Sequence, residues 1–174
     1  VFEKSLGQWV AAETLVADTP DVGTRFGHDV SIDGELLAVS SPSADGSGKV
    51  FLYQQDQNAW QFAASVTATD TTAGDQFGDS ISLQGDRLAV GASKHDHNGV
   101  WNTGAAYLFE LSNEQWQQTQ KLVGQANYGS VIARDQFGSS VDLDGNRVAI
   151  GAAFEDASSE DSGAVYLFDT ESGE

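Results

Sequence analysis

The chain has 174 residues, and 8 lysines and arginines face 26 aspartates and glutamates, for a formal net charge of −18 at pH 7. A surface this acidic repels phosphate backbones and anionic lipids, so we expect neither nucleic acid nor a membrane surface as a partner. Cysteine is absent, which excludes disulfides and thiol chemistry, and no apolar run approaches the roughly 18 residues of a membrane-spanning helix.

A Phe-Gly pair occurs three times in similar surroundings. The stretch DQFGDSISLQGDRLAVGAS, which begins at Asp75, is nearly repeated as DQFGSSVDLDGNRVAIGAA from Asp135. A looser copy, TRFGHDVSIDGELLAVSSP, begins at Thr24. Self-similarity at this period predicts one supersecondary unit used three times.

The first half of each repeat predicts a hairpin. Apolar residues follow the Phe-Gly pair with a spacing of two, as Val30 and Ile32 do in the first copy, and this spacing is typical of a strand. A glycine turn signal comes next, Asp33-Gly34 in the first copy, and predicts a tight connection to a second strand. The second strands, LLAV, RLAV and RVAI, end in small residues, which we expect where sheets crowd together.

The second half of each repeat predicts two more strands. In the segments GKVFLY, GAAYLF and GAVYLF, consecutive residues are apolar, so apolar side chains point to both faces of the strand. This pattern indicates a strand that is covered on both faces. The segments WVAAETL, WQFAASV and WQQTQKL are amphipathic and predict an exposed outer strand. Because their tryptophans recur, we interpret them as packing residues: Trp9, Trp60 and Trp116.

The expected fold is all-β, with three repeats of four antiparallel strands at about residues 3–53, 54–109 and 110–168. A small sheet that is apolar on both faces cannot bury itself, so we expect it to lie between copies of itself. Radial stacking of four-stranded sheets is the arrangement of blades in a β-propeller. A β-solenoid is the alternative, disfavoured because its coils are much shorter than these repeats.

The Phe-Gly pair, the Gly-Ala-Ser or Gly-Ala-Ala end of the second strand and the Gly-Ala-x-Tyr-Leu-Phe strand resemble the FG-GAP repeat. This repeat is the blade unit of integrin α-chain propellers and of many bacterial surface proteins. The resemblance covers almost the whole chain and is closest to the bacterial form. Integrin-type blades often carry a calcium loop between their first two strands. Here a two-residue turn replaces that loop, so the calcium sites of the family are not transferred.

Three repeats cannot close a ring, since propellers need about 4–8 blades. One interpretation is that the chain is a partial propeller cut from a longer protein, with about seven blades by analogy with the family. The other is that chains associate, two of them forming a six-bladed ring in which the Trp9 strand completes a neighbour's last blade. The expected partners are therefore further blades of a parent protein or a homo-oligomer.

In an antiparallel blade the long loops emerge together on one face, and binding usually occurs on loops held by a rigid scaffold. The loop KHDHNGVWNTG breaks the repeat and contains a non-recurring tryptophan, Trp101, which would suit a sugar ring or a partner's anchor residue. The alternative is that Trp101 folds down over its own blade. His95, Asp96 and His97 precede it as further ligand-binding candidates, although solvated loop residues are the simpler interpretation.

Two other loops contribute candidates. Tyr128 and Arg134 lie in the long connection ANYGSVIARDQ and have no counterparts in the other copies. Asp75 and Asp135 precede two Phe-Gly pairs and predict a hydrogen bond that fixes a loop. The densest acidic loop predicts at most a weak Ca²⁺ site, with a soluble acidic loop as the simpler interpretation: Glu155, Asp156, Glu160 and Asp161. No cofactor is firmly indicated.

The sequence contains no nucleophile elbow, phosphate-binding glycine loop or HExxH motif, so a catalytic role is not expected. The predicted function is an extracellular or cell-surface recognition or adhesion module, in a bacterium, that presents its loop face to a protein or glycan. A carbohydrate-active propeller enzyme with catalytic residues partly in other blades is an alternative, since fold alone does not fix function. A structural spacer in a large surface protein is another.

Overall fold

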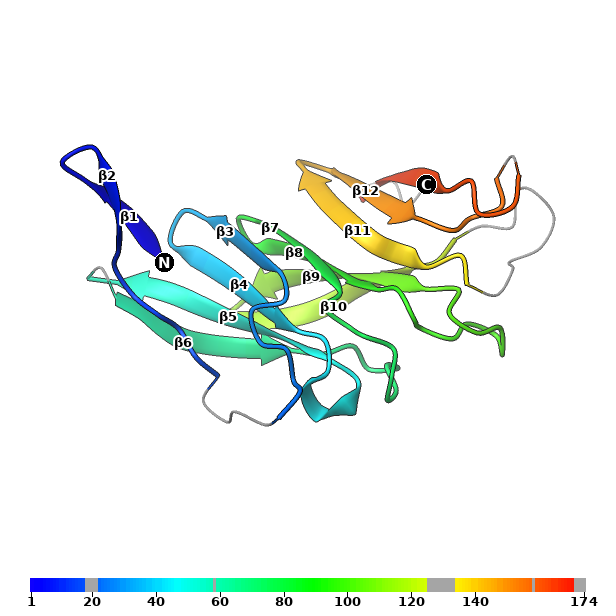
Figure 1. The fold of residues 1–174 in the computed structure, drawn as a ribbon, viewed down its shortest axis with the longest axis horizontal. Coiled ribbons are helices and arrows are strands. Elements are labelled where there is room, and N and C mark those ends of the chain that lie inside the picture. The colour runs from blue at the N-terminus through cyan, green and yellow to red at the C-terminus, as the bar shows by residue number, and fades with distance from the viewer. Residues whose placement is uncertain (18–21, 58, 125–133, 158, 171–174) are drawn as a thin grey trace.

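The computed structural model describes residues 1–17, 22–57, 59–124, 134–157 and 159–170 (Figure 1). In these ranges the chain forms β-strands, connected by loops and by one single-turn 3-10 helix, η1 (Ala44–Gly46). The prediction of an all-β chain is confirmed. No helix in the described ranges has the length and apolar character that crossing a bilayer requires.

The strands form one hairpin and three antiparallel sheets, each built from strands consecutive in the chain. The hairpin pairs β1 (Phe2–Ser5) with β2 (Gln8–Ala11). Sheet 1 contains β3 (Val30–Asp33), β4 (Leu36–Ser41), β5 (Lys49–Asp56) and β6 (Ala59–Val66). Sheet 2 contains β7 (Ser80–Gln84), β8 (Arg87–Ala92), β9 (Ala105–Ser112) and β10 (Gln115–Leu122). Sheet 3 contains β11 (Phe137–Asp144), β12 (Arg147–Ala152) and β13 (Ala164–Asp169).

The predicted four-stranded antiparallel unit is therefore confirmed in sheets 1 and 2. The predicted tight turns are present as well, because Asp33 pairs with Leu36 and leaves two residues in the turn. The first turn residue is a glycine with positive φ in each sheet, at 57° for Gly34, 56° for Gly85 and 56° for Gly145. A two-residue hairpin with glycine at its first position has the backbone twist that antiparallel strands favour.

The three sheets lie side by side and are fanned in chain order, without a closed ring among the described residues (Figure 1). The innermost strands contact one another, β3 against β7 and β7 against β11. One apolar cluster fills the space between sheets 1 and 2 and a second the space between sheets 2 and 3. β5 supplies residues to both of its faces, Val50 and Leu52 toward sheet 2 and Phe51 and Tyr53 away from it. The prediction of a strand covered on both faces is confirmed there.

The Phe-Gly pair marks the place where one sheet meets the next. Phe77 is fully buried, and its ring centroid lies 5.6 Å from that of Tyr107 and 5.9 Å from that of Phe109. The backbone also approaches closely: a Cβ built on Gly104 would lie 2.0 Å from the carbonyl oxygen of Phe137, and one on Gly48 would lie 2.1 Å from that of Phe77. Only glycine fits these two positions.

Candidate functional site

The loops that join the second strand to the third are bonded to the start of the next sheet. In sheet 2, the Arg134 N–H donates to the Trp101 carbonyl at 2.9 Å, and the Phe137 N–H donates to the Thr103 carbonyl at 2.9 Å. The Gln136 N–H donates to the Asn102 carbonyl at 3.2 Å. The loop that carries Trp101 is therefore held against sheet 3 by main-chain bonds.

Trp101 is presented outward by this loop. Its side chain is 73% exposed, so the alternative in which it covers its own sheet is wrong. Asp96 fixes the loop from within, because its carboxylate accepts the Asn102 N–H at 2.8 Å. His97 closes a short turn with Val100 through two main-chain bonds, and its ring contacts the Asn98 amide at 2.9 Å.

Beside the segment bonded to Trp101 lies an open hollow of about 460 Å³ on the same loop face. Its lining comes from the residues before sheet 3 and from the loop between β12 and β13: Arg134, Asp135, Gln136, Phe154, Asp156, Glu160 and Asp161. Phe154 is 43% exposed there. Carboxylates beside an aromatic ring can bind a cationic side chain or the hydroxyl groups of a sugar.

The four calcium candidates do not converge. Glu155 is only 8% exposed, and one carboxylate oxygen of Asp156 accepts the Asp161 N–H at 2.7 Å. Within the described ranges no group of three or more histidine, aspartate or glutamate side chains is placed to hold a metal ion. Calcium binding by Glu160 and its neighbours stays a prediction. Tyr128 lies outside the described residues.

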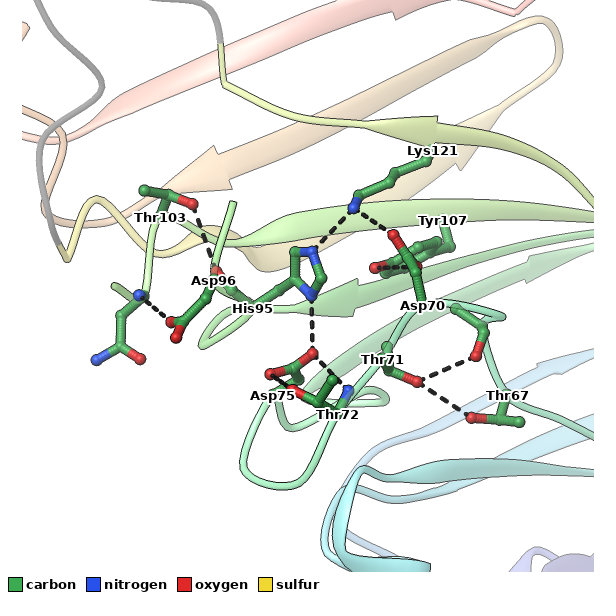
Figure 2. A network of polar contacts seen from close by, with 12 residues as sticks. Thr67, Asp70, Thr71, Thr72, Asp75, His95, Asp96, Thr103, Tyr107 and Lys121 are labelled. Atoms are coloured by element: carbon green, nitrogen blue, oxygen red, sulfur yellow. Dashed lines mark hydrogen bonds and ion pairs between the residues drawn. The ribbon is translucent and has the colours of Figure 1, made fainter. Parts of the chain in front are cut away.

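His95, at the start of the loop that carries Trp101, lies in a polar cluster defined by His95, Asp75, Lys121, Asp70 and Tyr107 (Figure 2). His95 is 5% exposed, so the interpretation of this residue as a solvated loop residue is wrong. Its Nδ1 lies 2.8 Å from the Asp75 carboxylate and its Nε2 lies 2.8 Å from the Lys121 ammonium. Because an ammonium group only donates, Nε2 accepts that bond and Nδ1 donates to Asp75.

The other half of the cluster is centred on Asp70. Its carboxylate accepts bonds from the Lys121 ammonium at 2.5 Å and from the Tyr107 hydroxyl at 3.0 Å. Burial and the bond to Asp70 raise the pKa of Tyr107 far above its usual value, so this hydroxyl stays protonated. Desolvation, with the charges of Lys121 and His95, lowers the pKa of His97 nearby.

The cluster joins the two long loops of sheet 2 to strands β9 and β10. Asp75 also accepts bonds from the N–H and the hydroxyl of Thr72, at 2.8 and 3.1 Å, so the predicted loop-fixing role of Asp75 is confirmed. An aspartate–histidine pair occurs in many catalytic sites, but here Nε2 of His95 already faces Lys121 and is shielded from solvent. The cluster therefore positions the Trp101 loop.

A family model for the FG-GAP repeat matches residues 9–53, 60–109 and 116–168. The chain belongs to the FG-GAP repeat family. No protein with a curated description matches it. Among solved structures, the computationally designed Ika4 protein is similar over 92% of this chain and 99% of its own, with 9% identity and a TM-score of 0.38. That likeness is too distant to bear on function.

The sheets of this FG-GAP chain do not coincide with its sequence repeats. Each matched repeat begins at a tryptophan-led strand, but the strands led by Trp60 and Trp116 are the outer edges of sheets 1 and 2, which precede the rest of their repeats. Lys121 lies on such an edge strand, so its contact with Asp70 crosses from one sequence repeat to another. This is why the sequence repeats alone gave no sign of the polar cluster.

We expect the FG-GAP chain to lose stability in acid through Asp70. Partial burial raises the pKa of Asp70, but its bonds to Lys121 and Tyr107 outweigh this and hold it below the usual 3.8. A lowered pKa stabilises the fold above 3.8, and this contribution is lost as the pH falls through the folded-state pKa. Its size is at most about 1 kcal/mol, because the side chain is 44% exposed and screened.

The measurement is urea unfolding of the wild type and Asp70→Asn from neutral to acidic pH. The difference in unfolding free energy between them should be largest near neutral pH and should shrink below 3.8. A difference that stays constant over the whole range would contradict this role of Asp70.

Proposed function

We propose that this FG-GAP chain is a non-catalytic recognition or adhesion module at the surface of a bacterial cell, which binds a protein or glycan ligand through its loop face. The observation that supports this best is the 73% exposure of Trp101 on a loop whose backbone is fixed on both sides. A rigid, exposed tryptophan supplies a large contact area at little entropic cost.

The chemistry of the neighbouring hollow supports the same function. Asp156, Glu160 and Asp161 give it negative charge, and Phe154 adds an apolar surface. A net charge of −18 attracts cationic groups over some distance and accelerates their encounter. The ligands that fit are a protein segment with basic side chains and a glycan whose ring stacks on an aromatic side chain.

We expect Trp101→Ala to weaken ligand binding by at least about 10-fold, as truncation of a central aromatic anchor does. Candidate ligands come from a glycan array and from an array of extracellular proteins, and affinities are measured by calorimetry. Trp9→Ala is the matched control, because Trp9 is 69% exposed on the β1–β2 hairpin.

Two results would contradict the proposal. If Trp101→Ala binds every identified ligand as tightly as the wild type and the Trp9→Ala control do, Trp101 is not the residue that anchors the ligand. If the bound ligand is a sugar and mass spectrometry detects its hydrolysis by the wild type, the chain is an enzyme and the non-catalytic function is wrong.

A further inference from the structure

The face of sheet 3 that points away from sheet 2 is exposed to solvent. The residues at the equivalent positions of sheets 1 and 2 are buried. Leu52 on β5 packs against sheet 2 and is 0% exposed, and Leu108 on β9 packs against sheet 3 and is 4% exposed. Leu167 holds the same position on β13 and is 74% exposed, with Val165 beside it at 71%. Sheet 3 therefore presents the surface that sheets 1 and 2 cover.

The face of sheet 1 that points away from sheet 2 shows the converse. Leu83 on β7 packs toward sheet 1 and is 6% exposed, and Leu143 on β11 is 7% exposed. The matching Ile32 on β3 is 58% exposed, and Val30 is 60% exposed. These side chains line an open apolar groove of about 590 Å³. Sheet 1 thus presents the surface that receives a preceding sheet.

Hydrogen bonds between the inner strands give each interface a direction. A side chain on the inner strand of one sheet accepts a main-chain N–H from the inner strand of the next sheet or from the turn that follows that strand. The bonds include Leu83 N–H to Ser31 at 3.0 Å, Gly85 N–H to Asp33 at 2.7 Å, Leu143 N–H to Ser82 at 3.0 Å and Gly145 N–H to Gln84 at 2.8 Å. We call this set the inner ladder.

The two ends of the molecule carry opposite halves of the inner ladder. On β11, Asp142 and Asp144 hold the positions of the accepting side chains Ser82 and Gln84. In sheet 1, Ile32 on β3 and Gly34 in the turn that follows it hold the positions of the donating residues Leu83 and Gly85. Acceptors at one end and donors at the other are complementary within a single chain.

We propose that these faces are two halves of one interface, and that a second copy of this chain occupies it head to tail, with sheet 1 of one copy on sheet 3 of the other. A second copy is the occupant because both halves belong to the same molecule and correspond, position by position, to its internal interfaces. The contact is heterologous, so it closes a ring if the rotation permits and otherwise adds further copies.

The β1–β2 hairpin is compatible with this docking through a strand exchange. β2 is the tryptophan-led outer strand, but it pairs only with the four-residue β1. A lone two-stranded hairpin is marginally stable. When sheet 1 of the second copy docks on sheet 3 of the first, β2 of the second copy reaches the free edge of β13. There β13, with the sequence Leu167-Phe168-Asp169, takes over from β1, with the similar sequence Val1-Phe2-Glu3, as the pairing partner of β2.

The test is the oligomeric state of the wild type, Ile32→Glu and Leu167→Glu by sedimentation velocity over the micromolar range, with salt added to screen the charge of −18. We expect the wild type to associate. Each variant alone should associate at least on the order of 100-fold more weakly, because its glutamate would be buried without a partner. Both residues are exposed in one copy, so the melting temperature of dilute protein should stay unchanged.

Mixing the two variants tests the head-to-tail geometry. Leu167→Glu keeps an intact sheet 1 face and Ile32→Glu keeps an intact sheet 3 face, so the mixture should form a pair that neither variant forms alone. A face-to-face dimer would be lost in only one variant and would gain nothing on mixing. A monomeric wild type throughout the range would overturn the proposal.

Discussion

Gly104→Ala is expected to destabilise the chain by about 2–5 kcal/mol. Two costs contribute. The residue has φ of +84°, a conformation that L side chains adopt at a cost, and its Cβ would lie 2.0 Å from the Phe137 carbonyl oxygen and 2.5 Å from the Phe137 nitrogen. Both contacts are with main-chain atoms of sheet 3, so the side chain cannot escape by rotation and the two sheets must separate.

Gly163→Ala is the matched control, since Gly163 holds the same position in sheet 3 with φ of +74°. Its Cβ would meet nothing closer than the Ala153 carbonyl oxygen at 3.1 Å. In dilute protein it should therefore cost only the conformational part, about 1–2 kcal/mol. Urea unfolding followed by circular dichroism measures both. Equal losses for the two variants would show that close approach of the sheets contributes nothing.

Phe77→Ala is expected to cost about 3–5 kcal/mol, the usual range for removing a buried phenylalanine ring. The ring is 0% exposed and packs edge-on against Phe109 and at a tilt against Tyr107. It belongs to the cluster between sheets 1 and 2, so its loss opens a cavity that neither sheet can fill.

Phe26→Ala removes the same residue of the repeat from sheet 1. Phe26 is partly buried against Phe51 and borders the open apolar groove, so we expect a loss of at most about 2 kcal/mol. Thermal unfolding of both variants checks the pair. A cost for Phe26→Ala as large as that for Phe77→Ala would mean that the groove is closed in solution, as it would be in an associated form.

The strands and turns were predictable because they depend on neighbouring residues. Alternating Val30 and Ile32, followed by glycine, specify a hairpin locally, and the two apolar faces of β5 imply sheets on both sides. Whether a recurring tryptophan is buried, as predicted, depends on which strands lie beside its own strand. Trp60 is 5% exposed as predicted, whereas Trp9 is 69% exposed because β2 has only β1 beside it.

The candidate site was predictable in part. The exposed loop with Trp101 follows from its departure from the repeat, but the burial of His95 does not, because it depends on Lys121 from a strand 26 residues away in sequence. Asp70 and Tyr107 likewise meet through contacts that cross the sheet. Sequence periodicity shows which residues share a face, and it contains no information on which polar side chains meet between loops.

The inner ladder has a consequence for how such chains change in length. Its donors are main-chain amides, which every copy possesses whatever its side chains, and its acceptors vary among serine, aspartate and glutamine. Duplication or deletion of a whole unit in the gene therefore preserves these bonds at the new junction. Evolution can alter the number of units without first adjusting the innermost strands to one another.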